Sequence, residues 1–285
     1  MTATGTATGQ LTSFYGEVTS LERVMGFLQR NDVDLEHLQA RDLYEHDLDC
    51  QNLGAFGMLE LIAATVAERT APQPDDHVLD VGCGMGGPGR FLVDRFGCSV
   101  TGIDLLPLRI ESAEELTRRT GLTHRISYQV ADATALPFED AAFAQAWMLD
   151  VGIHVHDKAA MFGEIARVLR PGGLLVMHDQ MGPLPKAMTP VTRQAPYRAP
   201  TLPQLIRYVE AAGLRLLTWQ DTTHRIVAYF DQVKTRYGPL EPGPDEEARP
   251  WRRWIRITTN AYLTTLDELG GRTGIVIAQR RPTAA

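Results

Sequence analysis

Residues 77–90, H-V-L-D-V-G-C-G-M-G-G-P-G-R, combine residue types that can bind a nucleotide. An apolar, strand-like run contains the acidic Asp80, and glycines at 82, 84, 86 and 87 precede a helix-like run. Because glycine has no Cβ, the backbone N–H groups of such a turn can approach a ligand closely. The carboxylate can hold a cationic or hydroxyl-rich part of that ligand. The pattern therefore predicts a nucleotide-type cofactor at the carboxyl edge of a parallel sheet.

Two further acidic residues lie at the ends of strand-like runs. Asp104 follows the run at residues 100–103, 24 residues after Asp80, where a carboxylate can accept hydrogen bonds from a ribose diol. Asp132 lies in the run I-S-Y-Q-V-A-D-A-T-A-L-P-F at residues 126–138. One aspartate at a strand end is more often a turn former than a ligand. Three at successive strand ends favour a binding site at one edge of the sheet.

The glycine spacing leaves a second cofactor open. Gly82-x-Gly84-x-x-Gly87 also fits the dinucleotide pattern G-x-G-x-x-G. Dinucleotide-binding proteins usually carry an apolar or small residue at the position that Asp80 occupies here. An NAD(P)-dependent oxidoreductase is therefore the weaker alternative.

With a fourth motif, A-R-V-L-R-P-G-G-L-L-V at residues 166–176, the chain resembles the class I S-adenosylmethionine-dependent methyltransferases. The nearest likeness is to the ubiquinone/menaquinone-biosynthesis-like (type 11) branch, and it covers roughly residues 55–220. The resemblance implies an α/β fold: a Rossmann-like, seven-stranded, mostly parallel sheet with an antiparallel final strand, plus an N-terminal helical lid. It also implies S-adenosylmethionine as the cofactor and says far less about the methyl acceptor.

Several matching residues are implied to surround the methionine end of the cofactor. Asp80 and the backbone of Gly82 and Gly84 would flank the amino-acid part. Met148 or Leu149, after the fourth strand, would line the cleft beside the sulfonium. Two explanations stay open for the glycines at 86, 87 and 89: contact with the ligand, or close packing of the helix on the strand.

The nucleoside end has its own implied contacts. In the family pattern Asp104 binds the ribose hydroxyls and Leu105 packs on the adenine. Asp132 accepts a hydrogen bond from the adenine amino group, and the backbone N–H of Ala133 donates to a ring nitrogen.

A proton acceptor is expected after the fourth strand, in W-M-L-D-V-G-I-H-V-H-D-K at residues 147–158. His154 matches best the place where related enzymes often carry a histidine, and an imidazole titrates near neutrality. A packed loop histidine is the alternative for His154. Asp179, at the end of the fifth strand beside His178, is the second catalytic candidate because one of the two must face the pocket.

Three residues are predicted to contact the acceptor. Tyr15 lies in an expected N-terminal helix where family members often place a tyrosine over the cofactor or substrate. Tyr197 lies in the proline-rich segment at 183–203, and Asp150 lies in the loop after the fourth strand, where a purely structural hydrogen bond is the alternative. The Arg- and Trp-rich residues 249–256 could bind an anionic acceptor such as a prenyl diphosphate or form a surface helix.

Composition limits the partners. The net charge of −7 and the lack of a basic stripe disfavour nucleic acid, and no run approaches the roughly 20 apolar residues of a membrane span. The three cysteines lack metal or redox spacing, so we expect no metal site and a cytoplasmic location. The protein is expected to be a monomer or homodimer.

The expected organisation is a disordered tail at 1–10, a helical lid at 11–54 and a methyltransferase core at 55–285. Helices are expected at 11–30, 34–46, 55–69, 201–212, 226–237 and 251–269, and residues 181–200 should form a lid insert.

The expected function is methyl transfer to O, N or C of a small, largely apolar metabolite, in bacterial specialised metabolism. One alternative is a C-methyltransferase acting on an alkene or a prenyl diphosphate. The other is a methyltransferase fold that binds the cofactor without methylating, as a cyclase or a regulatory protein.

Overall fold

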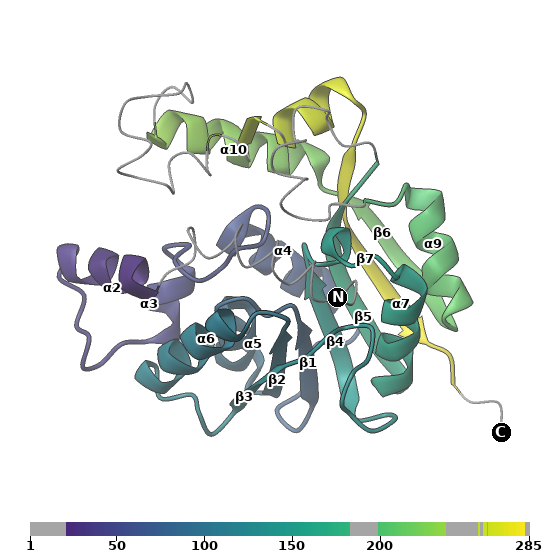
Figure 1. Ribbon diagram of the computed structural model, residues 1–285, viewed down its shortest axis with the longest axis horizontal. Coiled ribbons are helices and arrows are strands. Elements are labelled where there is room, and N and C mark those ends of the chain that lie inside the picture. Colours follow the sequence, from purple (N-terminus) through teal and green to yellow (C-terminus); the bar gives the residue numbers. More distant parts are fainter. Residues whose placement is uncertain (1–20, 183–198, 238–255, 257–258, 261, 283–285) are drawn as a thin grey trace, which may run out of the picture.

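A seven-stranded mixed sheet lies at the centre of the chain, with the strand order β3-β2-β1-β4-β5-β7-β6 (Figure 1). This computed structural model describes residues 21–182, 199–237, 256, 259–260 and 262–282. The strands are β1 (His77–Val81), β2 (Ser99–Asp104), β3 (Ile126–Val130), β4 (Phe143–Leu149), β5 (Leu169–Met181), β6 (Leu214–Asp221) and β7 (Arg272–Arg280). Only β7 runs antiparallel, and it pairs with both β5 and β6. The expected fold class is confirmed.

Helices cover both faces of the sheet. They are α2 (Leu21–Arg30), α3 (Ala40–Tyr44), α4 (Ala55–Ala67), α5 (Gly87–Phe96), α6 (Pro107–Arg119), η1 (Gly152–His154), α7 (Lys158–Val168), α9 (Leu202–Ala211), α10 (Thr223–Tyr237) and η3 (Thr264–Glu268). The apolar cores on the two faces are separate. One contains α4, α5 and α10, and the other contains α7 and α9. Strands buried on both faces read as continuous apolar runs, as β1 and β4 do.

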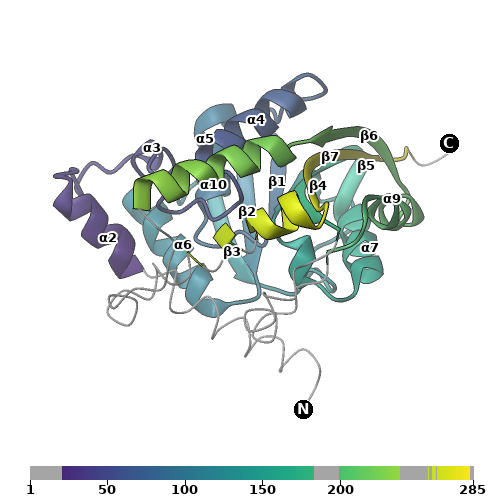
Figure 2. The same ribbon diagram turned by 90° about the horizontal axis from the view of Figure 1, so that it is seen from above.

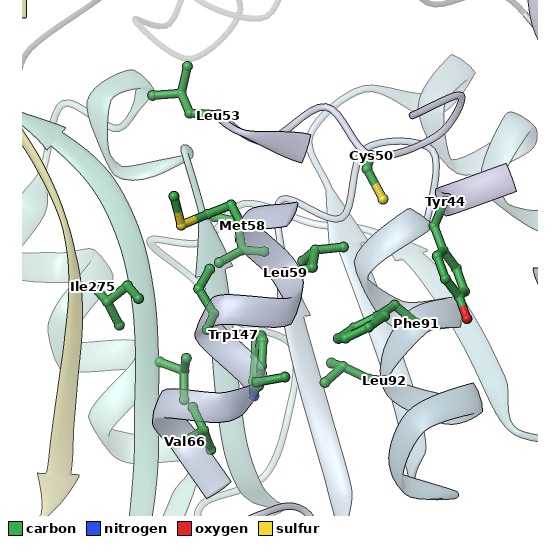
Figure 3. Close-up of a cluster of buried hydrophobic side chains, with 14 of the residues drawn as sticks. Tyr44, Cys50, Leu53, Met58, Leu59, Val66, Phe91, Leu92, Trp147 and Ile275 are labelled. Carbon is green, nitrogen blue, oxygen red and sulfur yellow. The ribbon is translucent and has the colours of Figure 1, made fainter. Parts of the chain in front are cut away.

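The face with α4 and α5 carries the larger aromatic core. Figure 3 shows Met58 and Val66 of α4 and Phe91 of α5 around Trp147 of β4. The Trp147 indole N–H donates to Gln145 Oε1 at 2.9 Å. Trp147 is therefore a core residue.

The C-terminal helices form a cap above the carboxyl ends of the strands. Figure 1 places α10 and η3 at this edge, and Figure 2 shows α10 extending across the sheet toward α3. Ile226 and Phe230 of α10 are buried in the same core as Leu53 and Met58. The Phe230 ring stacks on Tyr262 with centroids 5.3 Å apart. The cap is thus continuous with the core beneath it.

Two expected helices differ from the structure. The expected helix at 34–46 is shortened to α3, because the Asp34 carboxylate accepts from Glu36 N–H at 2.9 Å and forms a local turn instead. The described part of the expected helix at 251–269 ends in η3, a π-helical turn. Residues 1–20, including Tyr15, and most of the expected lid insert, including Tyr197, lie outside the described residues.

The described residues contain neither a membrane-spanning helix nor a cluster of side chains suited to a metal ion. No described helix is both long and apolar enough to cross a membrane. No group of three or more His, Cys, Asp or Glu side chains among the residues described is arranged to hold a metal ion.

Candidate active site

The glycine turn after β1 needs glycine for its conformation and its close contacts. Gly82 has φ +71°, and a Cβ there would lie 2.3 Å from Val151 Cγ2. A Cβ at Gly86 would lie 2.2 Å from the Tyr128 hydroxyl, and one at Gly87 would lie 2.7 Å from the Asp49 carbonyl oxygen. Packing alone therefore accounts for Gly86 and Gly87.

Asp104 joins this turn to the end of β2. Its Oδ2 accepts from Gly84 N–H at 3.1 Å, and its Oδ1 accepts from Leu106 N–H at 2.9 Å. The Arg109 guanidinium lies 3.6 Å from Oδ2 and also donates to Gln51 Oε1 at 2.7 Å. The carboxylate predicted to hold a ribose is thus fixed beside the glycine turn, with a charged partner from α6.

Asp80 is buried directly beneath the turn, with 2% of its surface exposed. Its Oδ2 has no hydrogen-bond partner. Burial, and next the charge of Asp104, raise the pKa of Asp80 to about 7. A cationic group beside this oxygen would supply the missing partner and favour the ionised form. Asp80 therefore suits the ammonium end of a ligand.

Asp132 follows β3, at the edge where the two other acids lie. Its Oδ1 accepts from both the N–H and the hydroxyl of Thr134 at 2.8 Å, which is a local turn. Asp132, Ala133 and Leu105 are all partly buried. Asp132 therefore forms a turn. Its other oxygen, Oδ2, takes no part in these two hydrogen bonds.

Met148 and Leu149, expected to follow the fourth strand, are the last two residues of β4 and point to opposite faces of the sheet. Asp80 is in register with Trp147, and side chains alternate along a strand, so Leu149 shares the face of Asp80. Met148 is fully buried in the core on the other face, against α7. Leu149 is the better placed of the two to reach a ligand held by Asp80.

Asp150 directly follows β4 and binds the residues that precede α4 (residues 40–54, the N-terminal segment). It has the left-handed φ of +56°, and its Oδ2 accepts from Leu53 N–H at 2.6 Å. His178 Nδ1 lies 3.7 Å from the same oxygen. Asp150 thus makes the structural hydrogen bond that was the alternative to acceptor binding. Its other oxygen, Oδ1, has no hydrogen-bond partner.

His154 ends the short helix η1 and is partly buried. Burial, and next the positive charges of Arg109 and Lys158, lower the pKa of His154 to about 3. The imidazole is therefore neutral at physiological pH. It can accept a proton, although its basicity is weak.

Asp179 lies at the end of β5 and is 1% exposed. Its Oδ1 accepts from Gln180 N–H at 2.8 Å, and its Oδ2 lies so close to Gly152 that a Cβ there would be 2.6 Å away. Burial, and next the charge of Asp150, raise the pKa of Asp179 to about 8. This shift favours the protonated carboxyl, which can donate a hydrogen bond.

Sequence reasoning did not identify the residues that hold the N-terminal segment against the turn. Arg109 binds Gln51, Arg90 binds Asp49, and the Tyr44 hydroxyl donates to Asp94 Oδ2 at 2.6 Å. These partners lie 41 to 58 residues apart in the chain. Only the acidic Asp49 and the basic Arg90 give a weak signal, because such charges are rarely fully buried without a partner.

The structure thus brings together Asp80, Gly82, Gly84 and Asp104 at one edge, and Asp150 and Asp179 at the ends of β4 and β5. His154 lies at the end of η1, where the charges of Arg109 and Lys158 reach it. A family model described as a methyltransferase domain matches residues 78–173. Methyltransferase GfsG from Streptomyces halstedii is 32% identical over 218 residues, which cover 72% of this chain and 78% of GfsG.

Two further comparisons are less complete or more distant. The chloroplastic tocopherol O-methyltransferase of Arabidopsis thaliana is 43% identical over 114 residues, but these are 40% of this chain and only 33% of that protein. The crystal structure of the [4+2]-cyclase SpnF superimposes with a TM-score of 0.66 at 21% identity, covering 96% of this chain and 95% of SpnF, which shows a shared fold. Because the match to GfsG covers more than two thirds of both chains at 32% identity, the chain belongs to the class I S-adenosylmethionine-dependent methyltransferases.

Proposed function

We propose that this protein transfers the methyl group of S-adenosylmethionine to O, N or C of a small, largely apolar metabolite. The proposal rests on one observation: the Asp104 carboxylate accepts a hydrogen bond from Gly84 N–H, beside the buried Asp80. A role in bacterial specialised metabolism is supported by similarity to a Streptomyces enzyme and by a composition with only three lysines. Location in the cytoplasm stays a prediction.

The residues at the glycine turn fit the cofactor. The unpartnered Oδ2 of Asp80 suits its ammonium group, and the Asp104 carboxylate suits its ribose hydroxyls. Asp132 and Leu105 would hold the adenine, with Leu149 beside the sulfur. When bound, S-adenosylmethionine supplies a methyl group already activated for in-line displacement.

The chain itself must align the acceptor, exclude water and, for a hydroxyl or amine, take up a proton. His154 is the candidate base, because its neutral imidazole lies in the loop after β4. The acceptor proton would pass to a ring nitrogen as the bond from oxygen or nitrogen to the methyl carbon forms. Asp179, whose raised pKa favours the protonated form, would donate a hydrogen bond beside Gly152 of η1.

An apolar acceptor is supported by the apolar character of the core that lies next to the carboxyl ends of the strands. Leu53, Met58, Phe230, Tyr262 and Leu266 belong to one buried cluster at this edge. Burial of apolar ligand surface against such residues is favourable at about 25 cal/mol per Å².

A cyclase that binds the cofactor without methylating is the second candidate. It is favoured by one observation, the superposition on SpnF over nearly the full length of both chains. The two functions would share the cofactor site. A methyltransferase passes the methyl group to an acceptor, whereas a cyclase would leave it on the sulfur and form ring bonds within its own substrate.

The proposal is tested with S-adenosylmethionine carrying a labelled methyl group and a panel of acceptors: a tocopherol, an alkylated hydroquinone, geranyl diphosphate and sarcosine. We expect label in a hydroxylated apolar acceptor and none in sarcosine. Binding of S-adenosylhomocysteine by calorimetry without label transfer to any acceptor would favour the cyclase or regulatory alternative. Absence of both binding and transfer would refute the cofactor site.

A further inference from the structure

Gln180 is a buried side chain whose amide has no partner. It lies near the carboxyl end of β5 and is 1% exposed. Neither its Oε1 nor its Nε2 has a hydrogen-bond partner. Buried amides are almost always paired, since leaving a donor and an acceptor unsatisfied costs free energy. An orphaned amide therefore needs an explanation.

The strand places Gln180 on the face below the cap. Leu174 and Val176 of β5 belong to the core with α4 and α10, so alternation puts His178 and Gln180 on that same face. Gln180 is one step nearer to the carboxyl edge than His178, and it is in register with Thr273 of β7. Figure 1 shows α10 and η3 above this edge of the sheet.

The polar neighbours of Gln180 are engaged with one another. His178 Nε2 lies 3.0 Å from the Thr222 hydroxyl, which lies 3.0 Å from the Thr273 hydroxyl. Asp150 Oδ2 accepts from the backbone of Leu53. None of these contacts involves the Gln180 amide, and Asp150 Oδ1 and His178 Nδ1 also have no hydrogen-bond partner. Both ends of the amide are therefore left for a group from outside the protein.

We infer that Gln180 binds a neutral hydroxyl or carbonyl group of the methyl acceptor and so helps to select it. The inference rests on the proposed function. An amide offers one acceptor and two donors, which matches a hydroxyl or a carbonyl. The Asp150 carboxylate, 3.7 Å from His178 Nδ1 on this face, opposes an anion such as a diphosphate. A cation would be bound better by a carboxylate at position 180.

A pair of variants separates ligand binding from a structural role. Gln180→Met keeps the shape of the side chain and removes both polar ends. Gln145 is the matched control: it is 2% exposed on β4, and its amide donates to the Thr70 carbonyl at 2.8 Å and accepts from Trp147 at 2.9 Å. We expect Gln145→Met to lower Tm by roughly 4–8 °C and Gln180→Met to leave Tm unchanged or raised.

The kinetic test uses a hydroxylated acceptor of the panel that wild-type protein methylates and that carries a second hydroxyl besides the methylated atom, compared with the deoxy analogue that lacks only this second hydroxyl. Gln180→Met should raise KM for the hydroxylated acceptor at least about tenfold and leave kcat and the KM for S-adenosylmethionine unchanged. Its KM for the deoxy analogue should equal that of wild type. An unchanged KM for the hydroxylated acceptor would overturn the inference.

The inference and the proposed function fail in different ways. If wild-type protein methylates no acceptor, the proposed function fails, and the thermal comparison alone decides the status of Gln180. A drop in Tm for Gln180→Met as large as that for Gln145→Met would show that the amide is needed by the fold, and it would overturn the inference. An unchanged or raised Tm supports a binding role.

Discussion

Arg90 of α5 and Asp49 of the N-terminal segment form a fully buried ion pair, with Nη2 2.7 Å from Oδ2 and both side chains 0% exposed. Arg90 also donates to Thr117 Oγ1 at 2.7 Å and to the carbonyls of Met85 and Ala113. One guanidinium therefore links the glycine turn, α6 and the segment that lies over them. The part of the N-terminal segment around Asp49 is therefore anchored to the core.

The first prediction concerns this pair. Arg90→Met should lower the free energy of unfolding by about 3–5 kcal/mol, because it leaves the Asp49 carboxylate buried without its partner. The double variant with Asp49→Leu should recover much of the loss. Urea unfolding followed by circular dichroism measures both.

The control for Arg90 is an exposed arginine with a partner of the same kind. Arg118 pairs with Glu115 at 2.8 Å on the surface of α6. Arg118→Met should leave the urea midpoint unchanged, because exposed pairs contribute little. Equal effects for the two arginines would contradict the role given to the buried pair.

The second prediction concerns the cofactor acid Asp104. Asp104→Asn should weaken S-adenosylhomocysteine binding at least about tenfold in calorimetry, because a neutral amide accepts less strongly from ribose hydroxyls and loses Arg109. The acceptor KM should change little. Asp76 is the control, being 5% exposed at the opposite end of the sheet and paired with Arg170. If Asp76→Asn weakened binding equally, a general loss of stability would explain both results.

The binding edge was predictable from the sequence because its signals are local. Asp80, Asp104 and Asp132 each come at or just after the end of an apolar run, and parallel strands bring their carboxyl ends to one edge. The contacts of Gln51 with Arg109 and of Asp49 with Arg90 join distant segments, and no periodicity encodes them. The same holds for Gln180, whose significance lies in the partners that it lacks once the fold is formed.

The third prediction is a pH dependence of cofactor binding set by Asp80. Burial raises the pKa of Asp80 to about 7, so only about a tenth of it is ionised at pH 6 and about nine-tenths at pH 8. If the carboxylate holds the ammonium group, the Kd for S-adenosylhomocysteine should fall roughly tenfold as the pH rises from 6 to 8. Asp80→Asn should bind weakly at both pH values. A wild-type Kd that does not vary with pH would contradict this assignment.

The last prediction tests His154 as the proton acceptor. His154→Ala should lower kcat by about 10²–10⁴-fold while the Kd for S-adenosylhomocysteine stays the same. The control is His156→Ala, two residues further along the same loop and exposed to solvent, which should keep wild-type kcat.

The pH profile of His154 adds a second readout. Burial and the charges of Arg109 and Lys158 hold its pKa near 3, so the imidazole is already neutral at pH 5. Lowering the pH from 8 to 5 does not protonate His154. At saturating cofactor, kcat should therefore show no decrease caused by protonation of this histidine in that range. Wild-type turnover in His154→Ala would leave alignment by Asp150 and Asp179 as the source of catalysis.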